Sequence, residues 1–172
     1  RGRPVPPSSR DVRRAWVAVS TASLGAWLFP SGSHPRATAF DARRPGDDHV
    51  RMDPEQAARA YATERHAGQL YGSQPYIVHL TAVRQILRWA GFGDDHPLAI
   101  AAWLHDVVED TGTTREEVRD RFGHEVAELV WAVTGTGANR KERNASAYAK
   151  IRAWPDAAPL KLADRIANVE AS

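Results

Sequence analysis

Residues 99–110, which read AIAAWLHDVVED, form a strongly apolar segment that ends in four ionisable side chains. These are His105, Asp106, Glu109 and Asp110. The pattern predicts a helix from Pro97 to about Val108 that is buried nearly all round. An ionised Asp in such a segment is costly unless it is paired or binds a metal, and a continuing helix would place Glu109 on the face of His105. The equally weighted alternative is an ordinary core histidine at a helix end whose acids reach solvent.

Helical periodicity extends from residue 53 to the end of the chain, and no segment alternates for long enough to indicate a strand. Asp53, Pro54 and Glu55 have the residue types of an N-cap, a first-turn proline and a first-turn acid. Thr113 and Glu116 have the spacing of a capping box for a later helix. We therefore predict an all-α bundle of about seven helices, over residues 53–66, 77–90, 97–108, 113–122, 125–133, 142–154 and 160–171.

Residues 1–50 differ in composition from the rest of the chain. They contain eight Arg and four Asp without Lys or Glu, and six of the eleven prolines. Such a stretch lacks the periodic apolar face that a packed helix needs. We expect residues 1–51 to be a disordered or non-native extension, and residues 52–172 to be the folded domain that begins at the single methionine, Met52. The less favoured alternative is a signal peptide, because the apolar residues 15–29 follow three arginines.

The composition excludes several classes of protein. The chain has 172 residues without Cys, which excludes a disulfide scaffold, a thiolate zinc site and a cysteine nucleophile. Its net charge of +2 is not the basic excess of a nucleic-acid-binding protein. We expect a cytoplasmic protein without a nucleic-acid or membrane partner, and leave its oligomeric state open. Any metal site must use His, carboxylate and carbonyl ligands.

Lone polar residues interrupt apolar helical faces at two other places. His79 lies in PYIVHL, residues 75–80, and Asp164 lies in LKLADRIANV, residues 160–169, with Asn168 one turn later. Two His and two Asp from three helices would form a mixed nitrogen and oxygen site for a divalent ion such as Mn, Fe or Zn. Each residue alone has an ordinary alternative, which is a core histidine for His79 and a pair with Arg165 for Asp164.

The order of His79, His105-Asp106 and Asp164 is the H…HD…D pattern of HD-domain metal-dependent phosphohydrolases, which the chain resembles. Over residues 53–171 it is similar to the Rel/Spo-type alarmone hydrolases. The similar segments are His66–Gln69, Pro75–His79, Leu104–Thr111, Phe122–Gly123 with Val126, and Lys161–Arg165 with Asn168. Rel/Spo-type enzymes use Mn²⁺ to remove pyrophosphate from the 3′ position of guanosine 3′,5′-bis(diphosphate). The resemblance therefore implies an HD-domain fold, a small nucleotide substrate and Mn²⁺.

The resemblance also implies a role for individual residues. The implied metal ligands are His79, His105, Asp106 and Asp164. The implied pair that orients and activates water is Glu109 and Asp110. The candidate substrate contacts are Asn168, Lys161, Arg165 and Tyr71, with Arg65 as a further cation. Lys161 and Arg165 can equally pair with nearby acids, and Tyr71 can simply pack.

Departures from the alarmone-hydrolase pattern leave the substrate open. The loop 69–75 lacks the adjacent basic pair that usually follows the Gln, and Glu170 lies where a basic residue is usual. The basic segment 139–144 is either a replacement phosphate contact at a helix N-terminus or a solvated loop. The alternatives are an HD phosphatase acting on another nucleotide or phosphorylated cofactor, and a non-catalytic nucleotide-binding remnant. Because the family continues with at least one more helix, we expect a C-terminal truncation at Ser172.

Overall fold

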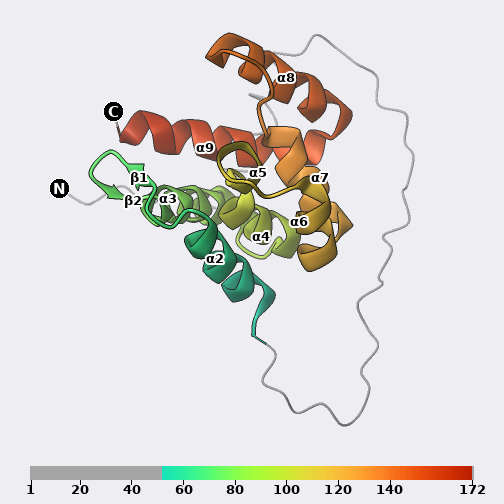
Figure 1. The fold of residues 1–172 in the computed structure, drawn as a ribbon. Helices are drawn as coiled ribbons and strands as arrows, with labels where there is room; N and C mark the ends of the chain where they lie inside the picture. The colour runs from blue at the N-terminus through green and yellow to red at the C-terminus, as the bar shows by residue number, and fades with distance from the viewer. Residues whose placement is uncertain (1–51, 172) are drawn as a thin grey trace, which may run out of the picture. The chain divides into compact units, whose positions relative to one another are not determined.

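The structure, a computed structural model, describes residues 52–171, so the extension expected over residues 1–51 lies outside the described residues. The helices are α2 (Pro54–Arg65), α3 (Ile77–Leu87), α4 (His96–Leu104), α5 (Val107–Asp110), α6 (Arg115–Phe122), α7 (His124–Val133), α8 (Arg140–Ala153) and α9 (Ala158–Glu170). A π-helical turn, Arg88–Phe92, follows α3, and a 3-10 turn, Pro155–Ala157, precedes α9. Strands β1 (Leu70–Tyr71) and β2 (Gln74–Pro75) pair antiparallel. The all-α prediction is confirmed (Figure 1).

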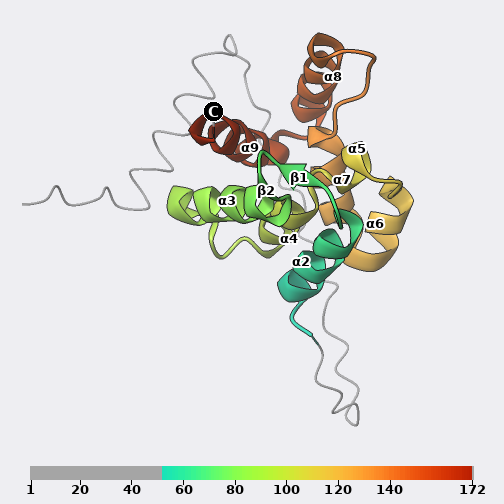
Figure 2. The same ribbon diagram turned by 60° about the vertical axis from the view of Figure 1, so that its left-hand side comes forward.

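Helix α4 forms the centre of the bundle. Its N-cap Asp95 accepts a hydrogen bond from the amide of Leu98 at 3.1 Å, and a proline occupies its first turn. All its residues from Leu98 to Leu104 are buried, as the apolar sequence predicts, because α4 packs against α2, α3 and α7. Helix α9 lies along α3 in both ribbon views (Figures 1 and 2). The polar residues carried by α3, α4 and α9 can therefore meet inside the bundle.

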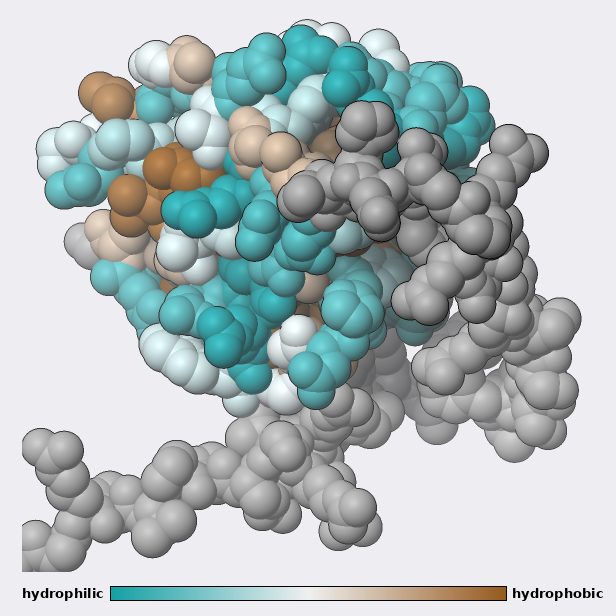
Figure 3. Space-filling model, turned by 90° about the horizontal axis from the view of Figure 1, so that it is seen from below, coloured by the Kyte–Doolittle hydropathy of each residue, from teal (hydrophilic) through white to brown (hydrophobic). Residues whose placement is uncertain are grey.

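The surface of the described residues is mainly hydrophilic on the face in Figure 3, where apolar side chains form only small patches. The large apolar side chains that are exposed are Met52, Leu70, Val78, Trp89, Tyr148, Leu162 and Val169. Single exposed apolar residues are normal on globular proteins. Between residues 52 and 171, no helix has the length and apolar character that crossing a membrane requires.

The continuous helix expected over residues 97–108 is wrong, because α4 ends at Leu104 and α5 begins at Val107. Asp106, with φ −101° and ψ −6°, lies outside both helices although its backbone stays in the right-handed helical region. Its carboxylate accepts a 2.7 Å hydrogen bond from the hydroxyl of Tyr76, 30 residues away on another element. The shared face of His105 and Glu109 was expected only for a continuing helix, and this condition is not met, because the two residues lie on either side of the break.

The expected capping box at Thr113 and Glu116 is displaced by one residue. Thr114 is the N-cap of α6, and its hydroxyl accepts a hydrogen bond from the amide of Glu117 at 3.1 Å. Thr113 is buried instead, with its hydroxyl 3.4 Å from the phenolic oxygen of Tyr61 on α2. Thr113 therefore joins the α5–α6 connection to α2, and the more exposed neighbouring threonine caps the helix.

The segment 68–75, which shows no strand pattern, contains the short hairpin of β1 and β2. Its two-residue strands are joined through Gly72 in the left-handed region at φ +62°, a conformation that favours glycine. The helix expected over residues 77–90 ends at Leu87 and continues as a π-helical turn that contains Gly91 at φ +86°. The hairpin places Tyr71 against His79 of α3 and Asn168 of α9.

A partly buried ion pair joins α2, α3 and the central helix α4. Arg84 donates to both carboxylate oxygens of Glu55, at 2.7 Å from Nε and 3.0 Å from Nη2, and the indole of Trp103 donates to Glu55 Oε1 at 3.0 Å. Arg84 is buried, so these charge-assisted bonds are not screened as a surface pair would be. The hydrogen bond from Arg84 lowers the pKa of Glu55 against the opposing effect of burial.

Substituting Glu55→Gln should lower the free energy of unfolding by about 2 kcal/mol at pH 7. The folded-state pKa of Glu55 lies below its ordinary value of 4.5, so its stabilisation is present above that pH and is lost as the pH falls through the folded pKa. Urea unfolding at pH 7 and about pH 3 should show the difference between the two proteins shrinking with acid. An equal difference at both pH values would contradict the ion-pair explanation.

Candidate active site and metal centre

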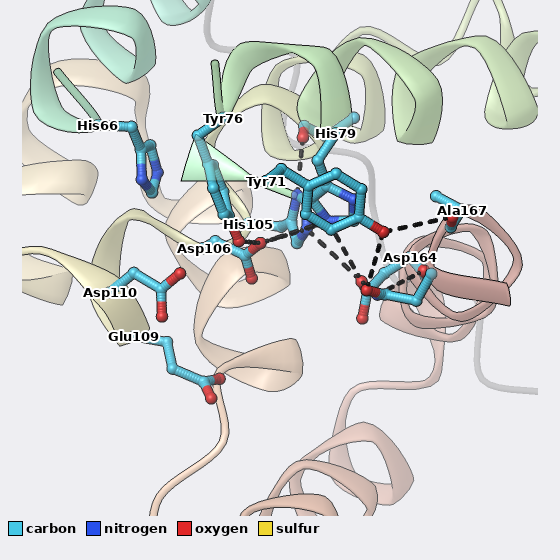
Figure 4. Close-up of polar contacts among 12 residues, drawn as sticks. His66, Tyr71, Tyr76, His79, His105, Asp106, Glu109, Asp110, Asp164 and Ala167 are labelled. Carbon is cyan, nitrogen blue, oxygen red and sulfur yellow. Dashed lines mark hydrogen bonds and ion pairs between the residues drawn. The ribbon is translucent and has the colours of Figure 1, made fainter. Parts of the chain in front are cut away.

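Four residues predicted as metal ligands meet between α3, the α4–α5 turn and α9. His79 Nε2 lies 3.3 Å from His105 Nε2 and 3.4 Å from Asp164 Oδ1. Asp106 Oδ2 lies 2.9 Å from His105 Nε2 and 3.5 Å from His79 Nε2. The ligand atoms of His79, His105 and Asp164 all fall within 4.8 Å of one another. Figure 4 shows the two imidazoles between the two carboxylates.

The histidines present the ring nitrogens that a metal needs. His105 Nδ1 lies 2.9 Å from the carbonyl oxygen of Ala102, to which it can only donate, so Nε2 is left to face the cluster. A histidine that donates one ring N–H to a backbone carbonyl has the tautomer and orientation that metal-binding histidines use. His79 also directs Nε2 into the cluster, and both imidazoles are 2% exposed.

The charges of this cluster are balanced in a way that fits a cation. Burial alone would lower the pKa of His79, but hydrogen bonds to Asp106 and Asp164 outweigh it and raise the pKa to about 9. The pKa of His105 is also raised against burial, chiefly by the charge of Asp106. Burial opposes ionisation of Asp106 and Asp164, yet the imidazoles hold the pKa of both carboxyls low. The two carboxylates therefore favour positive charge between them, and a divalent cation fits that position.

The residues around Asp164 orient its carboxylate. Lys161 Nζ donates to Oδ2 at 3.0 Å, and Asn168 Nδ2 donates to Oδ1 at 2.6 Å. Asn168 and Asp164 therefore share one helical face, as expected. Lys161 pairs with a nearby acid, which was the alternative to a substrate contact. The alternative pair between Asp164 and Arg165 is wrong, because Arg165 is exposed and Lys161 is the cation that Asp164 contacts.

Tyr71 covers the cluster from the β1–β2 hairpin. Its ring stacks on the imidazole of His79, with a centroid distance of 4.7 Å and an interplanar angle of 29°. Its hydroxyl donates to Asn168 Oδ1 at 3.2 Å and so joins the hairpin to α9. The half-buried tyrosine thus packs directly against the candidate ligands (Figure 4).

The acidic pair on α5 lies to one side of the His/Asp cluster in Figure 4. Glu109 Oε2 accepts a hydrogen bond from the amide of Gly135 at 2.6 Å, and its Oε1 lies 3.4 Å from Arg143 Nε. Asp110 Oδ2 accepts a hydrogen bond from Gln69 Nε2 at 3.0 Å. Both residues are exposed, and each carboxylate is held by a hydrogen-bond donor from another segment of the chain.

The basic segment 139–144 reaches this site through Arg143. The N-terminus of α8 has its own cap, because Asn139 Oδ1 accepts a hydrogen bond from the amide of Glu142 at 3.0 Å. Glu142 in turn accepts from the amide of Ala138 at 2.8 Å. Arg65, the further candidate cation, forms an ion pair with Glu117 away from the cluster.

Comparison with known proteins identifies the domain. The HD domain family matches residues 58–171 of the chain. The chain belongs to the HD domain family. A guanosine-3′,5′-bis(diphosphate) 3′-pyrophosphohydrolase of Aquifex aeolicus is 42% identical over 130 residues, which are 71% of this chain and 18% of that protein. The enzyme of that name called MESH1, from Danio rerio, is 37% identical over 115 residues, which are 63% of each chain.

A solved structure supports the same family. It is described as a metazoan ortholog of SpoT that hydrolyzes ppGpp, and it is 30% identical to this HD domain with a TM-score of 0.59. The match covers 75% of this chain and 72% of that one. The chain spans less than a fifth of the length of the first bacterial relatives that it matches.

Three residues of the HD domain site had no predicted role. Tyr76 donates to Asp106 Oδ2, Gln69 donates to Asp110, and His66 contacts both Gln69 and Tyr76. The two hydrogen bonds to the carboxylates span 30 and 41 residues of sequence. The sequence signal for Tyr76 is its position three residues before His79, which places it at the N-cap of α3, one turn before that histidine.

A divalent ion should stabilise the HD domain against heat, since it binds the assembled cluster and not the unfolded chain. An ion at about 100 times its Kd adds about 2.7 kcal/mol to the free energy of unfolding. We expect Mn²⁺ to raise Tm in calorimetry and an excess of chelator to reverse the rise. An unchanged Tm with Mn²⁺, Fe²⁺ and Zn²⁺ alike would argue against the metal site.

Proposed function

We propose that residues 52–172 form a Mn²⁺-dependent pyrophosphohydrolase domain that acts on guanosine 3′,5′-bis(diphosphate). The observation that carries the proposal is the pair of imidazole Nε2 atoms 3.3 Å apart, enclosed by the carboxylates of Asp106 and Asp164. The names of the relatives support the substrate. We propose a cytoplasmic location, because the proposed substrate is a small nucleotide.

The proposed reaction is hydrolysis of the bond between phosphorus and the 3′ oxygen. The oxygen of water forms a bond to the phosphorus attached to the 3′ oxygen, and the bond from that phosphorus to the 3′ oxygen breaks. One proton of the water ends on the 3′ oxygen. A carboxylate takes the other proton and then releases it to solvent. The products are guanosine 5′-diphosphate and pyrophosphate.

The four residues His79, His105, Asp106 and Asp164 would hold the metal. A bound divalent ion supplies positive charge to the phosphoryl oxygens and acidifies water. Glu109 and Asp110 are the proposed proton acceptors, because both are exposed carboxylates beside the cluster and both are held by a donor, Gly135 or Gln69.

The proposed substrate contacts are those that the resemblance implies. Asn168 and Lys161 already bind the carboxylate of Asp164, so they can contact substrate while they orient a ligand. Arg165 is exposed on α9, and its guanidinium can offer bidentate donors to phosphate. Tyr71 offers an aromatic ring at the entrance to the cluster, on which a nucleobase can stack.

A second candidate function is phosphate removal from another nucleotide or phosphorylated cofactor. It is favoured by the β1–β2 hairpin, in which Tyr71 and Gly72 follow Leu70 without a basic residue. A hairpin without cations holds a polyphosphate less strongly than one with them.

Chromatography of nucleotides after incubation with the purified chain and Mn²⁺ tests both candidates. Guanosine 3′,5′-bis(diphosphate) should yield guanosine 5′-diphosphate and pyrophosphate, and a chelator should stop the reaction. Products only from other nucleotides or phosphorylated cofactors would overturn the first candidate in favour of the second. No product from any member of the panel would overturn both and favour a non-catalytic binding domain.

A further inference from the structure

His66, the C-cap of α2, is buried and contacts two residues, Gln69 and Tyr76, that each donate to an acidic residue of the proposed function. It is 4% exposed. Its ring stacks on Tyr76 with a centroid distance of 4.5 Å and an interplanar angle of 17°. Its Nδ1 lies 2.7 Å from Gln69 Oε1. In Figure 4 the imidazole lies on the side of Tyr76 away from the His/Asp cluster, so His66 does not belong to the candidate ligands.

The hydrogen-bond partners of Gln69 fix where the proton of His66 lies. Asp110 Oδ2 accepts, so the Gln69 group beside it at 3.0 Å is the amide nitrogen. The amide oxygen is then left to accept from His66, which requires a proton on Nδ1. His66 Nε2 is buried and has no hydrogen-bond partner among the described residues, which also favours the tautomer with the proton on Nδ1.

The ring of Tyr76, on which His66 stacks, connects His66 to a second carboxylate, that of Asp106. Tyr76 donates from its hydroxyl to Asp106 Oδ2 at 2.7 Å, and His66 packs flat on its ring. On other sides Tyr71 and His79 meet the ring of Tyr76 edge-on, at centroid distances of 6.2 Å and 5.6 Å. The position of the phenolic hydroxyl, and with it the direction of the Asp106 carboxylate, therefore depends on the ring of His66.

We propose that His66 is a positioning residue that orients Asp110 through Gln69 and Asp106 through Tyr76. The inference rests on the proposed function for the roles of the two carboxylates. Histidine combines a flat ring for stacking with a hydrogen-bond donor at Nδ1, and no other side chain places both in this space. Phe keeps the ring without the donor, and Asn keeps a donor near Nδ1 without the ring.

These two substitutions separate the two contacts. His66→Phe should lower kcat by about 10- to 100-fold and leave the Mn²⁺ affinity unchanged, because only the link to Asp110 is lost. His66→Asn should weaken Mn²⁺ binding by about 10- to 100-fold, because Tyr76 no longer holds Asp106. Mn²⁺ affinity is measured by calorimetry, kcat by pyrophosphate release, and folding by urea unfolding. The exposed His96, changed to Phe and to Asn, is the matched control that should alter neither.

A second variant replaces Gln69 and keeps the imidazole of His66, and so tests the connection from His66 to Asp110. Gln69→Leu should reproduce the loss of kcat seen for His66→Phe, and the double variant should lose no more than either single one. Additive losses would overturn the route. Nitrogen NMR of the unsubstituted chain should show His66 protonated on Nδ1, and protonation on Nε2 would overturn the proposal independently of catalysis.

The outcomes also separate this inference from the proposed function. If the unsubstituted chain hydrolyses no nucleotide, the proposed function fails, while the Mn²⁺ affinity of His66→Asn and the tautomer still decide the inference. If the chain is active and His66→Phe retains full kcat, with His66→Asn retaining full Mn²⁺ affinity, the inference fails and the proposed function stands.

Discussion

Substituting Asp106→Ala should abolish binding of the divalent ion and lower hydrolysis by at least about 10³-fold, since a catalytic metal supplies several kcal/mol of transition-state stabilisation. Asp106 Oδ2 lies 2.9 Å from His105 Nε2 and accepts the hydrogen bond of Tyr76. Its removal leaves two imidazoles facing each other with Asp164 as the single carboxylate of the four-residue cluster. Titration calorimetry with Mn²⁺ and pyrophosphate release measure the two effects.

Two further variants define what Asp106 contributes. Asp106→Asn keeps the size of the side chain and loses its charge, so it should also weaken Mn²⁺ binding and thereby separate charge from packing. Asp94→Ala removes an exposed carboxylate away from the cluster and should change neither measurement. Undiminished Mn²⁺ binding by Asp106→Ala would show that the metal, if bound, lies elsewhere.

Three candidate ligands, His79, His105 and Asp164, could be found from the sequence because each is a polar residue in an apolar helical segment, and Asp106 directly follows one of them. Burying His79, His105 or Asp164 without a partner is unfavourable, so their joint occurrence on helices that share one core predicts that they meet. The structure places His79, His105 and Asp164 among the buried polar residues and brings their ligand atoms together. The same apolar periodicity predicts the helical bundle that the structure shows.

The details around the cluster depend on contacts between distant segments, which periodicity does not encode. The break after Leu104 accompanies a hydrogen bond from Tyr76 to Asp106, and Glu109 turns to Gly135, 26 residues along the chain. The capping threonine differs from the expected one because Tyr61 on α2 contacts Thr113. In each case the observed local conformation has a hydrogen-bond partner distant in the sequence, and such tertiary contacts override local propensity.

Glu109→Gln should lower kcat by about 10²- to 10⁴-fold and leave Mn²⁺ affinity unchanged, if Glu109 takes the proton from the attacking water. Glu109 Oε2 accepts the amide hydrogen bond of Gly135 at 2.6 Å, and Arg143 Nε lies 3.4 Å from Oε1. The glutamine oxygen can keep the bond to Gly135, so the side chain stays in place. What it loses is the ability to accept a proton, together with the ion pair to Arg143.

Comparing the two members of the acidic pair identifies which one is the base. Asp110→Asn should lower kcat less than Glu109→Gln if Asp110 orients water and Glu109 takes its proton, and the opposite order would exchange the roles. Glu125→Gln, in the exposed first turn of α7, is a matched control for loss of a carboxylate and should retain the kcat of the unsubstituted chain. Because the metal ligands are intact in all three variants, full activity in both Glu109→Gln and Asp110→Asn would mean that neither carboxylate of α5 is the general base.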